Sequence, residues 1–114
     1  KVLIVGLAYK PDVEDDRESP SYVLMEKLQI LGAEVGYHDP HIPMIKPSRE
    51  YSQFAGKKSE LLKRDSLTGY DAAIISTAHK GVDYEYLTDC IPSVVDTRNA
   101  IPEGTYDAEN IWKA

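Results

Sequence analysis

The sequence is short of several features that each point to a particular class of protein. It contains a single cysteine, Cys90, among 114 residues, which excludes a disulfide framework and favours a reducing compartment, here the cytoplasm. Acidic residues outnumber basic ones by 19 to 13 and the net charge is −6, so no basic surface is expected for nucleic acid or membranes. No apolar run approaches the roughly 18 residues of a membrane span, and no signal-peptide pattern is present.

Two patterns that mark common cofactor sites are also absent. The first apolar run is followed by residues 6–9, GLAY, which lack the second and third glycines of the dinucleotide fingerprint G-x-G-x-x-G. NAD binding by this chain is therefore disfavoured, and Gly6 is expected to give a sharp exit from a strand. The three histidines, His38, His41 and His79, do not have the spacing of metal ligands, so no metal site is expected.

What is present is an alternation of apolar runs with helical patterns. This alternation predicts a three-layer α/β/α, Rossmann-like domain with a mainly parallel sheet of about five strands. The length suits a single domain over residues 1–114. The expected strands are 1–8, 33–38, 72–76 and 93–96 with a short edge strand at 58–62, and the expected helices are 20–31, one starting at 65 or 66 and ending near 69, and 82–90.

Local signals fix the first helix best. Ser19 is a favourable N-cap, Pro20 suits the first helical position, and Gly32 suits the position after the helix end. The segment 40–58 is expected to be irregular, because it holds three prolines and a glycine, and loops of this length are commonly functional or face a partner. Trp112 is expected to pack on the body of the domain or on a neighbour.

Three loops should share one edge of the sheet, where parallel α/β sheets bind their ligands. They cover residues 8–18, 77–81 and 97–100, and the first runs into a helix N-terminus, which favours anions. We therefore expect this edge to hold the phosphates of a nucleotide. The side chains that can carry positive charge there are Lys10, Arg17, His79, Lys80 and Arg98.

Each candidate also has a plainer interpretation. Lys10 is held extended before Pro11 and can reach a phosphate, but it can equally be a solvated surface lysine. Arg17 can bind phosphate with two hydrogen bonds or pair with a neighbouring aspartate and shape the loop, and the second role is favoured. Arg98 is evenly balanced between the two kinds of role. Cys90 has no histidine beside it and is interpreted as structural.

Five stretches together resemble a known family. They are GLAYKPDVEDDRESPS, YHDPHIP, REYSQFAGKKS, YDAAIISTAH and VVDTRNA. In this order they resemble the C-terminal domain of the UDP-glucose/GDP-mannose dehydrogenase family. The second and third stretches look most like the branch that acts on UDP-N-acetylglucosamine or UDP-N-acetylmannosamine.

The resemblance implies a role in binding rather than in bond making. The family oxidises the sugar C6 alcohol to a carboxylate with NAD, which an N-terminal domain holds, and its catalytic cysteine lies in a segment that has no counterpart here. No catalytic residue is therefore expected in this chain. Lys10 matches a nucleotide-sugar contact, Arg98 an arginine that reaches the substrate phosphates or the neighbouring active site, and Arg17 a loop-shaping arginine.

The resemblance also sets the expected partners. Lys1 stands directly before a core strand, so we expect the chain to be a piece of a longer dehydrogenase with N-terminal and central domains, active as a homo-oligomer in polysaccharide biosynthesis. Three alternatives stay open. They are the same domain of a UDP-glucose 6-dehydrogenase, a free-standing nucleotide-binding module, and a non-catalytic assembly domain.

Overall fold

The structure is a computed structural model that describes residues 1–8, 10–12, 19–105 and 109–114. Within these ranges five strands form one parallel sheet in the order β2-β1-β3-β4-β5, which confirms the predicted fold class. The elements are β1 (Val2–Val5), α1 (Pro20–Ile30), β2 (Val35–His38), the 3-10 turn η1 (Ser52–Phe54), α2 (Arg64–Leu67), β3 (Ala72–Ile75), α3 (Tyr84–Cys90), β4 (Ser93–Asp96) and β5 (Ile111–Lys113).

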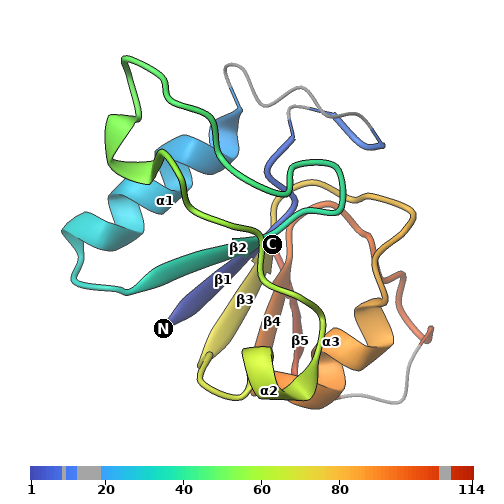
Figure 1. Ribbon diagram of the computed structural model, residues 1–114. Helices are drawn as coiled ribbons and strands as arrows, with labels where there is room; N and C mark the ends of the chain where they lie inside the picture. Colours follow the sequence, from blue (N-terminus) through green and yellow to red (C-terminus); the bar gives the residue numbers. More distant parts are fainter. Residues whose placement is uncertain (9, 13–18, 106–108) are drawn as a thin grey trace.

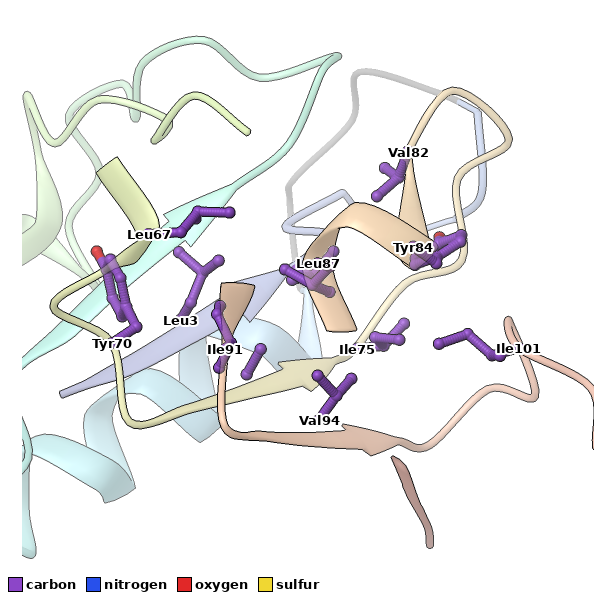
Figure 2. Packing of buried hydrophobic residues seen from close by; sticks show 12 residues of the cluster. Leu3, Leu67, Tyr70, Ile75, Val82, Tyr84, Leu87, Ile91, Val94 and Ile101 are labelled. Carbon is purple, nitrogen blue, oxygen red and sulfur yellow. The ribbon is translucent and has the colours of Figure 1, made fainter. Parts of the chain in front are cut away.

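Helices cover both faces of the sheet. Figure 1 shows α1 on one side and the shorter helices α2 and α3 on the other. Side chains of β1 alternate between the two layers: Ile4 packs in the cluster beneath α1, whereas Leu3 and Val5 pack in the cluster beneath α2 and α3. Figure 2 shows the second of these clusters, which includes Leu3. A strand buried on both faces reads as a continuous apolar run, and VLIV is such a run.

The first helix begins and ends where its local signals place it. Ser19 is the N-cap, and its hydroxyl oxygen accepts the N–H of Ser21 at 3.2 Å. Pro20 is the first helical residue, and Gly32 follows the helix with a positive φ of 94°. The inner face of the helix buries Tyr22 and Met25, so the helix is anchored through few side chains.

The fifth strand differs from the prediction. Residues 58–62 form no strand: Lys58 makes an isolated antiparallel bridge with Met44, and the N–H of Glu60 donates to the carbonyl of Tyr37 at 2.7 Å. This segment therefore touches the edge of β2 without forming a ladder. The fifth strand is β5, whose sequence IWK is too short to stand out from a pattern of alternation.

Two smaller expectations are also corrected. The last helix begins at Tyr84 rather than at residue 82, because Asp83 caps it through a 3.1 Å hydrogen bond from the N–H of Tyr86. Trp112 does not pack on the body of the domain; it is 60% exposed on the outer strand. Packing against a neighbour outside this chain is the expectation for Trp112 that stays open.

None of the helices in the described ranges has the length and apolarity needed to span a bilayer.

Candidate functional site

The register of the sheet brings the strand ends into one row. Val5 pairs with His38 on one side and with Ile75 on the other, Ile75 pairs with Asp96, and Asp96 with Lys113. The residues after these positions therefore form a common rim at the carboxyl edge. The strand order changes direction between β1 and β3, which is where ligands bind in sheets of this kind.

Gly6 shows how tightly the loops pack at this point. Its φ is +91°, and a Cβ atom there would lie 2.3 Å from the carbonyl oxygen of Thr77. Only glycine fits this turn and this contact. The predicted sharp exit from β1 is confirmed, and it brings the loop after β1 against the loop after β3.

Asp39 occupies the position where a phosphate was expected. One carboxylate oxygen, Oδ2, accepts the N–H groups of Leu7 at 2.7 Å and Ala8 at 2.9 Å, and it also bonds Nε2 of His79 at 2.8 Å. The other oxygen, Oδ1, accepts the N–H of His41 at 2.8 Å. The backbone donors at the end of β1 are thus already used by a buried carboxylate of the chain itself.

These contacts determine the charge of Asp39. Burial acts to raise the pKa of the carboxyl, but the hydrogen bonds from Ala8, His41, His79 and Leu7 outweigh it and hold the pKa below the ordinary value. Asp39 is therefore an internal anion at neutral pH.

His79 lies beneath the rim rather than on it. Its side chain is 0% exposed, and Nδ1 accepts the N–H of Asp12 at 2.7 Å. Because a backbone N–H can only donate, the ring proton is on Nε2 and points at Asp39. His79 therefore joins the loops after β1, β2 and β3, and it is not an exposed cation for a ligand.

The start of α1 is likewise closed by protein contacts. Ser19 accepts the N–H groups of both Ser21 and Tyr22, through its hydroxyl and its carbonyl oxygen respectively. The hydroxyl of Ser21 is buried and donates to the carbonyl of Gly6 at 2.9 Å. Among the residues of this edge that the structure describes, these backbone groups are therefore already bonded, and side-chain cations are the groups that can contact an anion.

Lys10 lies exposed at this edge in a fixed turn. Two residues later, Asp12 has a φ of 61°, donates its N–H to His79 and accepts the N–H of Lys80 at 2.8 Å through Oδ1. These bonds tie the turn that carries Lys10 to the loop after β3. Arg17, the third predicted contact, lies outside the described residues.

Arg98 is held at the ends of β3 and β4. Its Nε donates to the carbonyl of Ser76 at 3.0 Å. In the part of the chain that the structure describes, this is the one bond of the guanidinium to protein, so its outer nitrogens can bind an anion. Lys10 and Arg98 are thus both tied to the loop after β3.

Asp96 organises the loop that carries Arg98. Oδ1 accepts the N–H groups of Arg98 at 3.1 Å and Ala100 at 3.0 Å, and Oδ2 accepts the N–H of Ile101 at 2.9 Å and Nζ of Lys113 at 2.8 Å. Burial acts to raise the pKa of Asp96, but Lys113 and the three N–H groups outweigh it and lower the pKa. Sequence analysis missed Lys113, because its partner lies 17 positions away.

A groove of about 710 Å³ opens beside this loop. It is lined by two cations, Arg98 of the loop and Lys113 of β5, and by Thr97, Asn99, Asp96, Glu103 and Ala114. Its position at the ends of β4 and β5 suits an anionic ligand that reaches across from the switch point.

The buried titratable groups near the rim predict a pH-dependent stability. The pKa of His38 is lowered from 6.5 chiefly by burial, so the unfolded state binds its proton first as the pH falls below about 6.5. The lowered pKa values of Asp39 and Asp96 mean that their stabilisation is complete above about pH 4 and is lost below it.

We therefore expect the free energy of unfolding to fall in two steps on acidification. Urea unfolding measured between about pH 8 and pH 3 checks this. The variant His38→Gln should lack the first step and keep the second. A free energy that stays constant from neutral pH down to about 4 would contradict the assignment of His38.

The model of the UDP-glucose/GDP-mannose dehydrogenase family, UDP binding domain, matches residues 3–103. The chain belongs to this family. The matched range contains the predicted contacts Lys10, Arg17 and Arg98 and ends before β5.

Similar proteins carry related names. A UDP-N-acetyl-D-mannosamine dehydrogenase of Methanococcus maripaludis strain C7 is 31% identical over 121 residues, covering 99% of this chain and 24% of the relative. A UDP-glucose 6-dehydrogenase of Pseudomonas aeruginosa is 51% identical over 39 residues, 34% of this chain and 9% of the relative. The chain thus spans about a quarter of the length of the mannosamine dehydrogenase.

A solved structure supports the fold. The native structure of the UDP-N-acetyl-mannosamine dehydrogenase of Staphylococcus aureus has a TM-score of 0.71 at 24% identity, over 99% of this chain and 26% of that chain. The family domain therefore has the α/β/α architecture described above.

Proposed function

We propose that this chain is the UDP-sugar-binding domain, residues 1–114, of an NAD-dependent nucleotide-sugar 6-dehydrogenase. The observation that carries the proposal is the placement of Lys10 and Arg98 at the carboxyl edge of the sheet, in a domain of a UDP-binding family. Both cations are tied to the same loop, after β3, so they can act on one ligand. Arg17 is proposed as a further contact whose main role is to shape its loop.

The two cations have different tasks. The Nε of Arg98 is fixed by Ser76, so the guanidinium is oriented before a ligand arrives and can form a forked pair of bonds to phosphate. Lys10 supplies a compact charge from the opposite side of β3. Because the chain carries a net charge of −6, a diphosphate must be attracted by such local cations rather than by the overall field.

NAD fits this domain poorly. In dinucleotide-binding sheets the backbone at the end of the first strand contacts the pyrophosphate. Here the N–H groups of Leu7 and Ala8 are taken by Asp39, and an anion at that place would meet a carboxylate. We therefore propose that NAD is held by another domain of the parent enzyme.

The chain alone is proposed to be inactive. Cys90 ends α3, just before the start of β4, so it lies at the amino edge of the sheet, opposite the rim. Its position is consistent with a structural thiol and not with a nucleophile near the sugar. The oxidation of the C6 alcohol would take place in the other, N-terminal and central, parts of a cytoplasmic homo-oligomer, while this domain orients the substrate.

The substrate of the parent enzyme is proposed to be a UDP-N-acetylhexosamine. Similarity to the mannosamine dehydrogenases over nearly the whole chain supports this choice. Initial rates of NADH formation with UDP-N-acetylmannosamine, UDP-N-acetylglucosamine and UDP-glucose test it in the full-length enzyme. The highest kcat/KM should belong to one of the N-acetylated sugars; a preference for UDP-glucose would support that branch of the family instead.

A second candidate function is assembly. Met44 in the irregular segment 40–58 and Leu61 just after it are 49% and 59% exposed, and Trp112 is exposed on the outer strand. Such side chains suit contacts with the other domains or a second subunit. An assembly domain without a ligand site would show no saturable binding of UDP, which separates the two functions.

A further inference from the structure

Three side chains that are not proposed as nucleotide contacts meet at and just beneath the rim. They are Asp12 in the turn after β1, His41 after β2 and His79 after β3, and their potential ligand atoms all lie within 4.8 Å of one another. The rings of His41 and His79 are 4.7 Å apart between centroids and tilted by 60°. Sequence spacing could not show this cluster, because each residue comes from a different loop.

From this cluster we propose that Asp12, His41 and His79 form a binding site for a divalent transition metal ion of the zinc type. Two imidazoles and one carboxylate are a donor set that zinc and its neighbours in the periodic table prefer. Three protein ligands would leave one coordination position for water. The proposal does not depend on nucleotide binding.

The surroundings of His79 are those of a metal-binding histidine. Nε2 donates to the buried carboxylate of Asp39 at 2.8 Å, and such a partner orients the ring and increases the basicity of the other nitrogen. That other nitrogen, Nδ1, faces Asp12, whose Oδ1 lies 4.0 Å away. In the described ranges the ring nitrogens of His41 have no hydrogen-bond partner, so His41 can turn toward a metal without losing a bond to protein.

Binding requires a local rearrangement of the turn at Asp12. Ligand atoms around a tetrahedral zinc ion lie about 3.4 Å apart, from bond lengths of about 2.0–2.1 Å, so the cluster must contract slightly. The metal must also replace the N–H of Asp12, which bonds Nδ1 at 2.7 Å, so the backbone of this turn must move away from His79. Asp12 and His41 are exposed and half-buried, and rotation of their side chains supplies most of the contraction. The buried His79 and Asp39 stay in place.

Zinc titration of the untagged chain, after removal of metals with a chelator, tests the site. Calorimetry should show saturable binding of one equivalent of Zn²⁺, and Co²⁺ should give the visible absorption of a low-coordinate nitrogen and oxygen site. Loss of a residue that only hydrogen-bonds a metal ligand lowers metal affinity by about 10- to 100-fold. His41 is a proposed ligand itself, so His41→Gln should lower zinc affinity at least that much. His38→Gln is the matched control, since His38 bonds Glu60 outside the cluster, and it should bind zinc like the parent chain; Cys90→Ser should do the same.

Thermal melts show whether each variant is folded, and His41→Gln should fold because it is the backbone N–H of His41 that bonds Asp39. His79→Gln is left as a secondary test, since that residue is buried. No saturable zinc binding, or unchanged affinity in folded His41→Gln, would overturn the proposal. Unchanged affinity in Asp12→Asn would overturn the three-ligand assignment. None of these results bears on whether UDP binds.

Discussion

The variant Asp39→Ala is expected to lose at least about 3 kcal/mol of unfolding free energy, because buried donors cost about 1–3 kcal/mol each when they are left without an acceptor. The carboxylate accepts three backbone N–H groups and the Nε2 proton of His79. Without it these buried donors have no acceptor, and each unsatisfied donor is costly. Since small domains have only about 5–15 kcal/mol in total, the loss should be visible as a large shift of the urea midpoint.

Two further variants make this result specific. Asp39→Asn keeps one oxygen acceptor and should lose less than Asp39→Ala, so it preserves a measurable transition where the alanine variant does not fold. Asp89→Asn changes an exposed aspartate of α3 and should stay within about 0.5 kcal/mol of the parent chain. A similar effect of Asp39→Ala and Asp89→Asn would contradict the role of Asp39 as the organiser of the rim.

Loss of either proposed cation should weaken UDP binding without unfolding the domain. A hydrogen bond to a charged group contributes about 1.5–3 kcal/mol, so Lys10→Ala should lower UDP affinity by about 10- to 100-fold. Lys10 is exposed, so the melting temperature should change little. Lys63→Ala is the matched control, because Lys63 is an exposed lysine before α2 at the opposite edge of the sheet.

Arg98 permits a finer test. Arg98→Lys keeps the charge but cannot reproduce the fork that Ser76 orients through Nε, so it should still bind UDP more weakly than the parent chain. Calorimetric titration of each variant measures this, beside a thermal melt. Unchanged affinity in both Lys10→Ala and Arg98→Lys would remove these residues from the site. A loss accompanied by a collapsed melting temperature would make them structural.

Local signals in the sequence were sufficient for much of the fold. Ser19, Pro20 and Gly32 set the ends of α1 through capping and backbone conformation, which depend on adjacent residues. The buried strands were visible as apolar runs, because both faces of a parallel sheet are covered. β5 was missed because three residues carry too little pattern.

The interior of the site could not be predicted in the same way. Topology placed Lys10 and Arg98 on one edge, but the groups that hold the edge together are long-range pairs. Asp39 meets Leu7 and His79 across 32 and 40 positions, and Lys113 meets Asp96 across 17. In sequence Asp39 looked like the end of a strand before Pro40, and nothing nearby indicates that its carboxylate fills the backbone site of β1.

The carboxylate of Asp39 affects the binding of NAD and of UDP differently. A pyrophosphate seated on the N–H groups of Leu7 and Ala8, as NAD requires, would displace Asp39. A diphosphate held by Lys10 and Arg98 leaves Asp39 in place. We therefore expect this domain to distinguish UDP from NAD.

Isothermal titration of the chain with UDP and, separately, with NAD tests whether the domain distinguishes the two ligands. We predict saturable, weak binding of UDP and none of NAD under the same conditions, with UDP affinity falling as salt is added because the contacts are ionic. Binding of NAD that is tighter than binding of UDP would contradict the proposal that this domain binds the UDP-sugar and not the cofactor.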